Sequence, residues 1–332
     1  MLSKTHTEKL EETELKEEIP EDIHFEGEKH LSNVKQLTFG GQNAEGYFSF
    51  DDQSIVLQAA GVDRYGTECD QIYRADFTNG RPAPSTLLQR LSTGIGACTC
   101  SYFFPDNLHS IHASTFASQF DNITDISRTC PAKKCVSEQA KTDPLLKKLC
   151  NTSYTWDLFP GYDIYKVNQY GNFVARLTES IGYDAEGAVS PDGSKIVFTS
   201  MRSGDPELYL MDADGGNQKE LVKLMVVLRA IFTLQTPKFQ LTNGTLGYDG
   251  GPFFSPDGTK VIFRASRPNT PEEIKKYKQL LSYDLVDHWP WNCISNFNAT
   301  GHFGAFDLYS IGEDGQGLQR VTYNQNGFDA FQ

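Results

Sequence analysis

The chain contains an internal repeat built around Ser-Pro-Asp-Gly, and a repeat constrains a fold more than any local pattern does. Residues 182–202 align with residues 247–267, since both contain Gly-Tyr-Asp, then Ser-Pro-Asp-Gly, an apolar run and an arginine. Both segments follow a Leu-Thr pair and precede a second apolar run that ends in Asp-Gly, at 207–215 and 307–315. We therefore expect several copies of one small structural unit.

Weaker copies precede and follow these two. They begin at Leu37 and Leu91, and a fifth opens at Val321, so that successive starts lie 54, 86, 64 and 80 residues apart. A four-stranded unit of this kind needs only about 40–45 residues. The excess is expected in loops outside the sheets, in inserts at about 116–159, 221–239 and 268–305. We expect the middle insert to serve no structural need, and the last to contain a helix at 271–281 that Thr270 caps.

The Pro-Asp-Gly segments predict tight turns between strands. Proline sets φ near −65°, the aspartate bonds back to the backbone, and the glycine takes a positive φ. Ile196–Phe198 after one turn has the β-branched and aromatic content of a buried strand. The turn positions that recur in the repeat are Asp192, Gly193, Asp257 and Gly258.

Each unit then forms about four short antiparallel strands. One such sheet does not bury both of its faces, so successive sheets must stack around an axis. The predicted fold is all-β: a β-propeller of four-stranded blades, with about four blades and the start of a fifth.

These motifs resemble the TolB-type propeller repeat, a relative of the WD repeat. The likeness covers about 31–112, 161–220 and 240–332. The resemblance implies a six-bladed propeller that binds partner proteins and performs no chemistry. The separate N-terminal domain of TolB is not recognisable here, and the sequence stops inside the fifth repeat. An open ring exposes an apolar face and a strand edge, so we expect either a piece of a longer product or self-association.

The first thirty residues differ from the rest. They contain ten acidic and four basic side chains with few large apolar ones, which is typical of a solvated, disordered tail. They lack the basic and apolar regions of a secretory signal. We expect 1–30 to be this tail and 31–332 to be the propeller.

Two Tyr-Asp pairs and two arginines also recur with the repeat. A residue repeated in every unit is more typical of architecture than of a unique site. We expect Asp184 and Asp249 to accept charged hydrogen bonds from groups of a neighbouring blade, with Arg202 and Arg267 as the leading partners.

We predict no catalytic, cofactor-binding or metal-binding residues. The Gly-x-Ser-x-Gly motif of hydrolases and a phosphate-binding glycine loop are both missing from the sequence. His109 and His112 lie three residues apart on an expected strand and so point to opposite faces. His112 takes the place of Phe198 in the repeat, which favours a core histidine over a zinc ligand.

Seven cysteines point to disulfides and an oxidising compartment, because the 116–159 insert has little apolar content to fold around. The candidate disulfide residues are Cys69, Cys98, Cys100, Cys130, Cys135 and Cys150. Four Asn-x-Ser/Thr sequons, at Asn122, Asn151, Asn243 and Asn298, are compatible with a secreted glycoprotein. The alternative is a cytoplasmic protein with unpaired thiols, and an odd count leaves at least one cysteine without a partner in the chain.

The net charge of −13 argues against nucleic acid as a partner, and no apolar run is long enough to span a membrane as a helix. The favoured function is a non-catalytic scaffold that binds a protein partner at one face of the ring or at the mouth of its channel. The alternative is the propeller portion of a prolyl-oligopeptidase-like peptidase whose hydrolase domain is absent from this chain. A small ligand in the channel is a third possibility.

Overall fold

The computed structural model describes residues 34, 36–78, 81–82, 88–115, 130–152, 154–220, 246–289 and 306–321. The chain divides into two compact units, residues 1–39 and residues 40–332. In the first unit, the side-chain amide of Gln36 donates to the carbonyl of Thr38 at 2.7 Å. The predicted acidic tail and the predicted insert at 221–239 lie outside the described residues.

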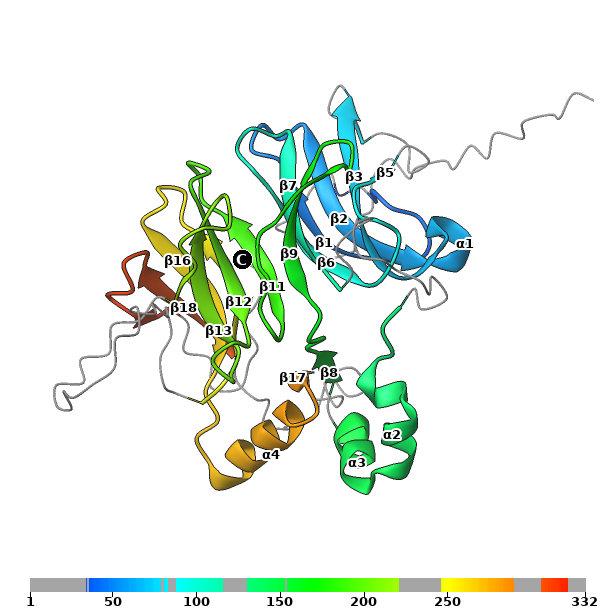
Figure 1. The fold of residues 1–332 in the computed structure, drawn as a ribbon, viewed down its shortest axis with the longest axis vertical. Helices are drawn as coiled ribbons and strands as arrows, with labels where there is room; N and C mark the ends of the chain where they lie inside the picture. The colour runs from blue at the N-terminus through cyan, green and yellow to red at the C-terminus, as the bar shows by residue number, and fades with distance from the viewer. Residues whose placement is uncertain are drawn as a thin grey trace, which may run out of the picture. The chain divides into compact units, whose positions relative to one another are not determined.

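The second unit contains four antiparallel sheets, one for each predicted repeat (Figure 1). The first has β1 (Gln42–Phe48), β2 (Ser54–Gly61), β3 (Thr67–Thr78), β4 (Arg81–Pro82) and β5 (Gln89–Arg90). The second has β6 (Cys98–Phe103), β7 (His109–Ser114), β9 (Asp163–Asn168) and β10 (Phe173–Arg176). The third has β11 (Asp184–Val189), β12 (Lys195–Ser200), β13 (Glu207–Asp212) and β14 (Lys219–Glu220). The fourth has β15 (Asp249–Phe254), β16 (Lys260–Ser266), β18 (Phe306–Gly312) and β19 (Gln319–Arg320).

Helices are few and short in the described part of the chain. They are α1 (Val62–Tyr65), α2 (Glu138–Thr142), α3 (Pro144–Thr152), α4 (Pro271–Leu281) and a 3₁₀ turn, η2 (Lys134–Val136). A separate two-stranded sheet pairs β8 (Tyr154–Asp157) with β17 (Leu285–Trp289). The described chain is thus mostly antiparallel β-structure, as the repeat predicts.

The Ser-Pro-Asp-Gly segments form the predicted turns between the first two strands of the third and fourth sheets. The carboxylate of Asp192 accepts from the Ser190 hydroxyl at 2.6 Å and from the Ser194 amide at 3.0 Å, which lowers the pKa of Asp192 to about 2. Gly193 and Gly258 take φ of +75° and +73°, a region that disfavours residues with a Cβ. Asp257 repeats the same bonds one sheet later.

Neighbouring sheets pack face to face through the apolar strands that the repeat marks. Ile111 and Ile164 of the second sheet pack with Ile196 and Phe198 of the third. The third and fourth sheets meet in the same way through a cluster that includes Val197 and Phe263. Each fully buried aromatic or aliphatic side chain of this kind contributes about 1.5–3 kcal/mol. Successive sheets therefore supply one another's cores.

The described parts of the first and third predicted inserts fold together instead of forming separate loops. We call this assembly, residues 130–152, 154–159 and 270–289, the insert module. It contains α2, α3 and α4, with β8 and β17 side by side (Figure 1). Its core is formed by Ala140, Leu146, Leu149, Leu280 and Leu285. Helix α4 has the predicted bounds and the predicted Thr270 cap, which Glu273 completes as a capping box.

Two disulfides hold the insert module. Cys135 is joined to Cys150 within it, and Cys69 of β3 is joined to Cys130 at its start. Cys98 and Cys100 were expected among the disulfide candidates, but both carry free thiols. Cys98 lies in the core between the first two sheets, where its thiol contacts the Ser114 hydroxyl at 3.4 Å, and Cys100 lines the pocket described below.

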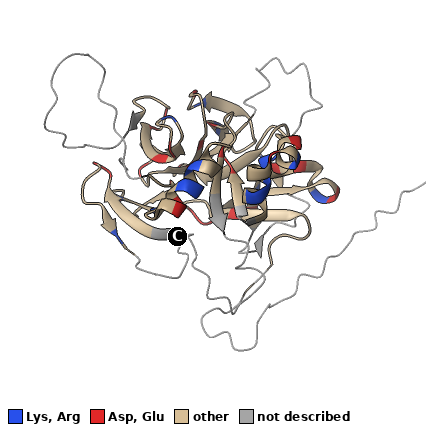
Figure 2. Cartoon of the chain, turned by 90° about the horizontal axis from the view of Figure 1, so that it is seen from below, with Lys and Arg blue, Asp and Glu red and all other residues tan. Residues whose placement is uncertain are grey.

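Charge is mixed over the molecule. Figure 2 shows Lys and Arg interspersed with Asp and Glu along the described part of the chain. Among the described residues, the helices are all too short or too polar to cross a membrane.

Candidate functional site

A β-bulge recurs at the same place in the first strand of every sheet. The pairing register shifts after the second or third residue of β1, β6, β11 and β15. At each shift one residue has a positive φ, between +50° and +58°. These bulge residues are Glu45, Cys100, Glu186 and Gly251. Such backbone is costly for a residue with a side chain, and bulges redirect side chains next to functional sites.

The four bulge residues line one pocket. With the open solvent at its mouth included, it measures about 470 Å³, and side chains from all four sheets contribute to it. Tyr47, Tyr102 and Phe253 lie two residues beyond the bulges, and Arg264 of β16 reaches in beside them. The repeat thus brings four equivalent positions to one place, although each carries its own side chain.

The most buried charged group of the pocket is Glu186. Its carboxylate accepts from the Tyr248 hydroxyl at 2.6 Å, from the Gly251 amide at 2.7 Å and from the Thr199 hydroxyl at 2.8 Å. Arg264 lies at 3.3 Å. Burial raises the pKa of Glu186, but Arg264 and these hydrogen bonds outweigh it and hold the pKa below its ordinary value. Glu186 is therefore ionised and fully engaged.

Glu45 has a different environment. It is half-buried, and its carboxyl shares a hydrogen bond with the Cys100 thiol. Burial raises the pKa of Glu45, and the nearby Glu186 charge adds to the rise. Among the described residues, no Lys, Arg or His forms a salt bridge with it.

Three aromatic rings from three sheets stand around the pocket, and we call Tyr47, Tyr102 and Phe253 the aromatic collar. Their centroids lie 5.4–5.8 Å apart, so every ring touches the other two. Phe50 packs edge-on against Tyr102 with 41% of its surface exposed. The Tyr47–Phe253 contact joins the first sheet to the fourth.

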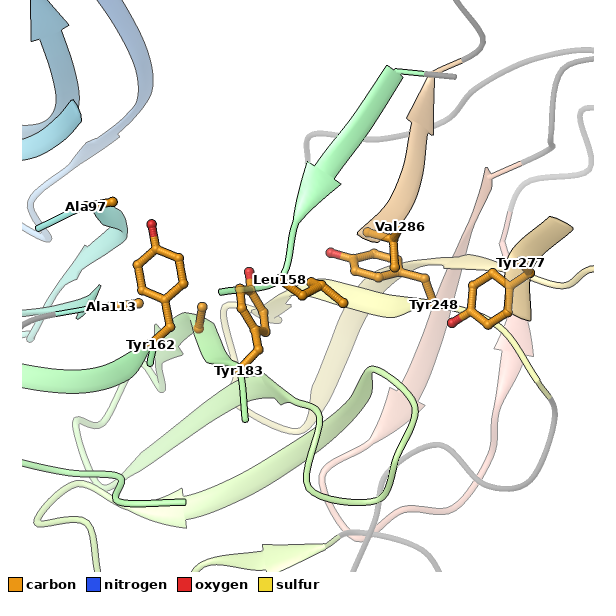
Figure 3. Packing of buried hydrophobic residues seen from close by; sticks show 9 residues of the cluster. Ala97, Ala113, Leu158, Tyr162, Tyr183, Tyr248, Tyr277 and Val286 are labelled. Carbon is orange, nitrogen blue, oxygen red and sulfur yellow. The ribbon is translucent and has the colours of Figure 1, made fainter. Parts of the chain in front are cut away.

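The insert module packs against Tyr248, a hydrogen-bond partner of Glu186. Tyr248, which bonds Glu186, belongs to an aromatic cluster that also includes Tyr162, Tyr183 and Tyr277, and Figure 3 shows Leu158 and Val286 of the insert module among these rings. Tyr277 of α4 also donates to Asp205 of the third sheet at 2.5 Å. These contacts fix the module to the sheets behind Glu186.

The recurring aspartates lie away from the pocket. Arg202 donates to Asp184 at 2.8 Å, and Arg267 lies 2.6 Å from Asp249. The arginines are the expected ones, but each belongs to the same sheet as its aspartate, contrary to the expected pairing between blades. The arginine follows β12 or β16, whose end pairs with the start of the strand that carries the aspartate, so the nearest cation comes from within the sheet.

The two histidines have different surroundings. His112 is buried, which lowers its pKa to about 4, and this confirms the interpretation of a core histidine. His109 lies at the turn and contacts Asp106 at 2.7 Å. Over the described ranges, His, Cys, Asp and Glu nowhere gather in a group able to hold a metal ion.

Sequence reasoning missed the pocket residues. Their signal is present, because each bulge residue lies four positions before the residue that opens the turn, at Ser49, Phe104, Ser190 and Ser255. In the four successive repeats, which are otherwise similar, the residue at this position is Glu, Cys, Glu and Gly. A position that varies between repeats is where a repeat protein places a unique site.

Comparison with known proteins supports the repeat assignment. No family model matches the chain. A 47-residue stretch, 14% of this chain, is 47% identical to the Tol-Pal system protein TolB of Bordetella pertussis and covers 11% of that protein. The resemblance to the TolB-type repeat is thereby confirmed over this stretch.

Solved structures show similar arrangements at low identity. TolB from Acinetobacter baumannii aligns with a TM-score of 0.44 and 14% identity, over 85% of this chain and 44% of that one. A puromycin-hydrolysing peptidase of Mycobacterium tuberculosis aligns with a TM-score of 0.43 and 10% identity, over 87% of this chain and 30% of that one. The chain spans less than half the length of each of these proteins.

Proposed function

We propose that the chain is a TolB-like β-propeller that binds a segment of a partner protein at the mouth of the pocket and performs no chemistry. The observation that carries this proposal is the convergence of four equivalent bulges, one from each sheet, on a single pocket with an aromatic collar.

In this proposal each sheet is one blade, and β1, β6, β11 and β15 surround the axis. The packing of each sheet on the next supports this arrangement, as does the contact of Tyr47 with Phe253 between the first and fourth sheets. Small sheets that share cores in chain order are typical of propellers.

The state of the pocket side chains favours binding over catalysis. Burial raises the pKa of the Cys100 thiol well above its ordinary value, so the sulfur stays protonated and is a poor nucleophile. Glu186 is occupied by five hydrogen-bond donors, which leaves it unsuited to proton transfer. His112 lies in the core and not in the pocket.

The rim of the pocket has the composition of a protein-binding surface. Phe50 is 41% exposed and packs edge-on against Tyr102 of the collar. Exposed aromatic side chains that are held in place by other rings are frequent anchors of protein interfaces. The two disulfides favour an oxidising compartment, outside the cell or periplasmic, as the place of this interaction.

Peptide selection tests this proposal. Random peptides displayed on phage are selected on the folded chain, and the affinities of the selected peptides are measured by fluorescence anisotropy. We expect Phe50→Ser to weaken binding at least tenfold, because the substitution removes an anchor at the rim. The control is Val136→Ser, since Val136 is 74% exposed on the insert module. Failure to select any peptide, or equal binding to Phe50→Ser and wild type, contradicts the proposal.

A further inference from the structure

Among the described residues that line the pocket, the charges do not balance. Three charged side chains line it, two carboxylates and one guanidinium. The guanidinium of Arg264 contacts Glu186 at 3.3 Å and the Tyr248 hydroxyl at 3.0 Å, so Arg264 and Glu186 offset each other. Glu45 has the Cys100 thiol as its hydrogen-bond partner, and Arg264 acts on its charge from a distance without forming a salt bridge with it.

Burying a carboxylate without a cation is unfavourable, and such a group either takes up a proton or acquires a counter-ion. Burial raises the pKa of Glu45, in line with this cost. A cation that entered the pocket would lower the pKa of Glu45 and gain Coulomb attraction to its carboxylate at low local dielectric.

The surroundings of Glu45 suit an organic cation better than a metal ion. Hard metal ions require several oxygen ligands. Glu45 bonds a thiol and shares the pocket with the rings of the aromatic collar, and the other carboxylate of the pocket, Glu186, is already engaged by Arg264 and its hydrogen-bond donors. Aromatic rings attract ammonium and guanidinium groups electrostatically and also accept the carbon chain that carries them. Glu45 and Tyr47 lie two residues apart on β1, and both line the pocket. One strand therefore supplies a carboxylate and an aromatic ring for contact with the same cation.

We propose that the pocket receives an organic cation from the bound partner segment, with Glu45 as its counter-ion and the aromatic collar packed against its stem. The cation is a lysine ammonium, an arginine guanidinium or an amino terminus. This inference names the group recognised by the site of the proposed function, and it therefore rests on that function.

Small probes test the inference without knowledge of the partner. Ligand-observed NMR titrations of the full chain use n-butylammonium for lysine, n-butylguanidinium for arginine and alaninamide for an amino terminus. The neutral control is n-butanol. We expect saturable binding of at least one cation and none of n-butanol, and the cation that binds most tightly identifies the source.

Variants assign the binding to Glu45. We expect Glu45→Gln, which keeps the shape and removes the charge, to weaken cation binding at least tenfold. The matched control is Glu179→Gln, because Glu179 is 81% exposed and lies beside Arg176, so the change in net charge is the same. Thermal unfolding of both variants confirms that they are folded.

The outcomes separate the inference from the proposed function. If no cation binds, or Glu45→Gln binds cations as well as wild type does, the inference is wrong. If selected peptides still lose affinity with Phe50→Ser in that case, the proposed function stands. If cations bind through Glu45 but no peptide is selected, the pocket is a small-cation site and the proposed function is wrong.

Discussion

At the scale of residues, the four bulge positions of the pocket share one backbone conformation but carry different side chains. The backbone of the four bulge residues is nearly identical, with φ within 8° of one another, while their side chains are two carboxylates, a thiol and a hydrogen atom. The conformation belongs to the repeat and positions whatever side chain is present. The side chains decide what the pocket recognises.

His112 gives a prediction at this scale. Burial lowers its pKa to about 4 in the folded chain, below the ordinary value near 6.5 that an unfolded chain retains. The unfolded state therefore binds a proton before the folded state does as the pH falls. The free energy of unfolding should decrease by about 3 kcal/mol between pH 6.5 and pH 4 because of this residue. Urea denaturation at a series of pH values measures the decrease.

The variant that isolates this effect is His112→Phe, because Phe198 and Phe263 occupy the same position in the next two repeats. We expect His112→Phe to lose the part of the acid sensitivity that His112 causes. His109→Asn, a substitution at the turn, should keep it. Equal acid sensitivity of His112→Phe and wild type would show that His112 does not titrate as proposed.

At the scale of elements, the inserts show how local and distant information combine. Helix α4 is encoded locally by Thr270, Pro271 and Glu273, which cap its first turn. Its apolar residue Leu280 meets Leu285 nearby in the sequence, but most of its core partners are distant. It is buried against Leu146 and Leu149 of α3, from an insert more than 120 residues earlier.

Leu280→Ala tests whether the two inserts fold as one module. Removing this fully buried side chain should lower the free energy of unfolding by about 2–5 kcal/mol. If the module is cooperative, hydrogen exchange should become faster in α3 as well as in α4. Lys275→Ala, on the exposed side of α4, is the control and should change neither. Faster exchange confined to α4 would mean that the inserts fold independently.

At the scale of the whole molecule, the two disulfides hold the chain over different distances. Cys135 and Cys150 are 15 residues apart, whereas Cys69 and Cys130 are 61 apart and join the first sheet to the insert module. A longer closed loop restricts the unfolded chain more.

We therefore expect the paired substitution of Cys69 and Cys130 by serine to lower the free energy of unfolding by about 4 kcal/mol, and that of Cys135 and Cys150 by about 3 kcal/mol. Denaturant titration of both variants measures the difference. Cys98→Ser is a control for loss of a thiol that forms no disulfide. The opposite order of the two losses would contradict the entropic explanation.

The sequence by itself determined the parts of this protein that depend on neighbours along the chain. The turns at Asp192 and Asp257, the strands beside them, the cap of α4 and the burial of His112 all follow from short patterns and from their repetition. The same patterns identify the TolB-type repeat.

Only the tertiary structure decided which residues meet across the chain. The pocket joins bulges that are 55 to 86 residues apart, the disulfides choose two pairs among six candidate cysteines, and the inserts share one core. No local sequence pattern predicts these contacts, because each is stabilised by burial against a partner from a distant part of the chain. The tertiary structure also brings Arg264 to Glu186. Among the described residues, it brings no salt-bridge partner to Glu45.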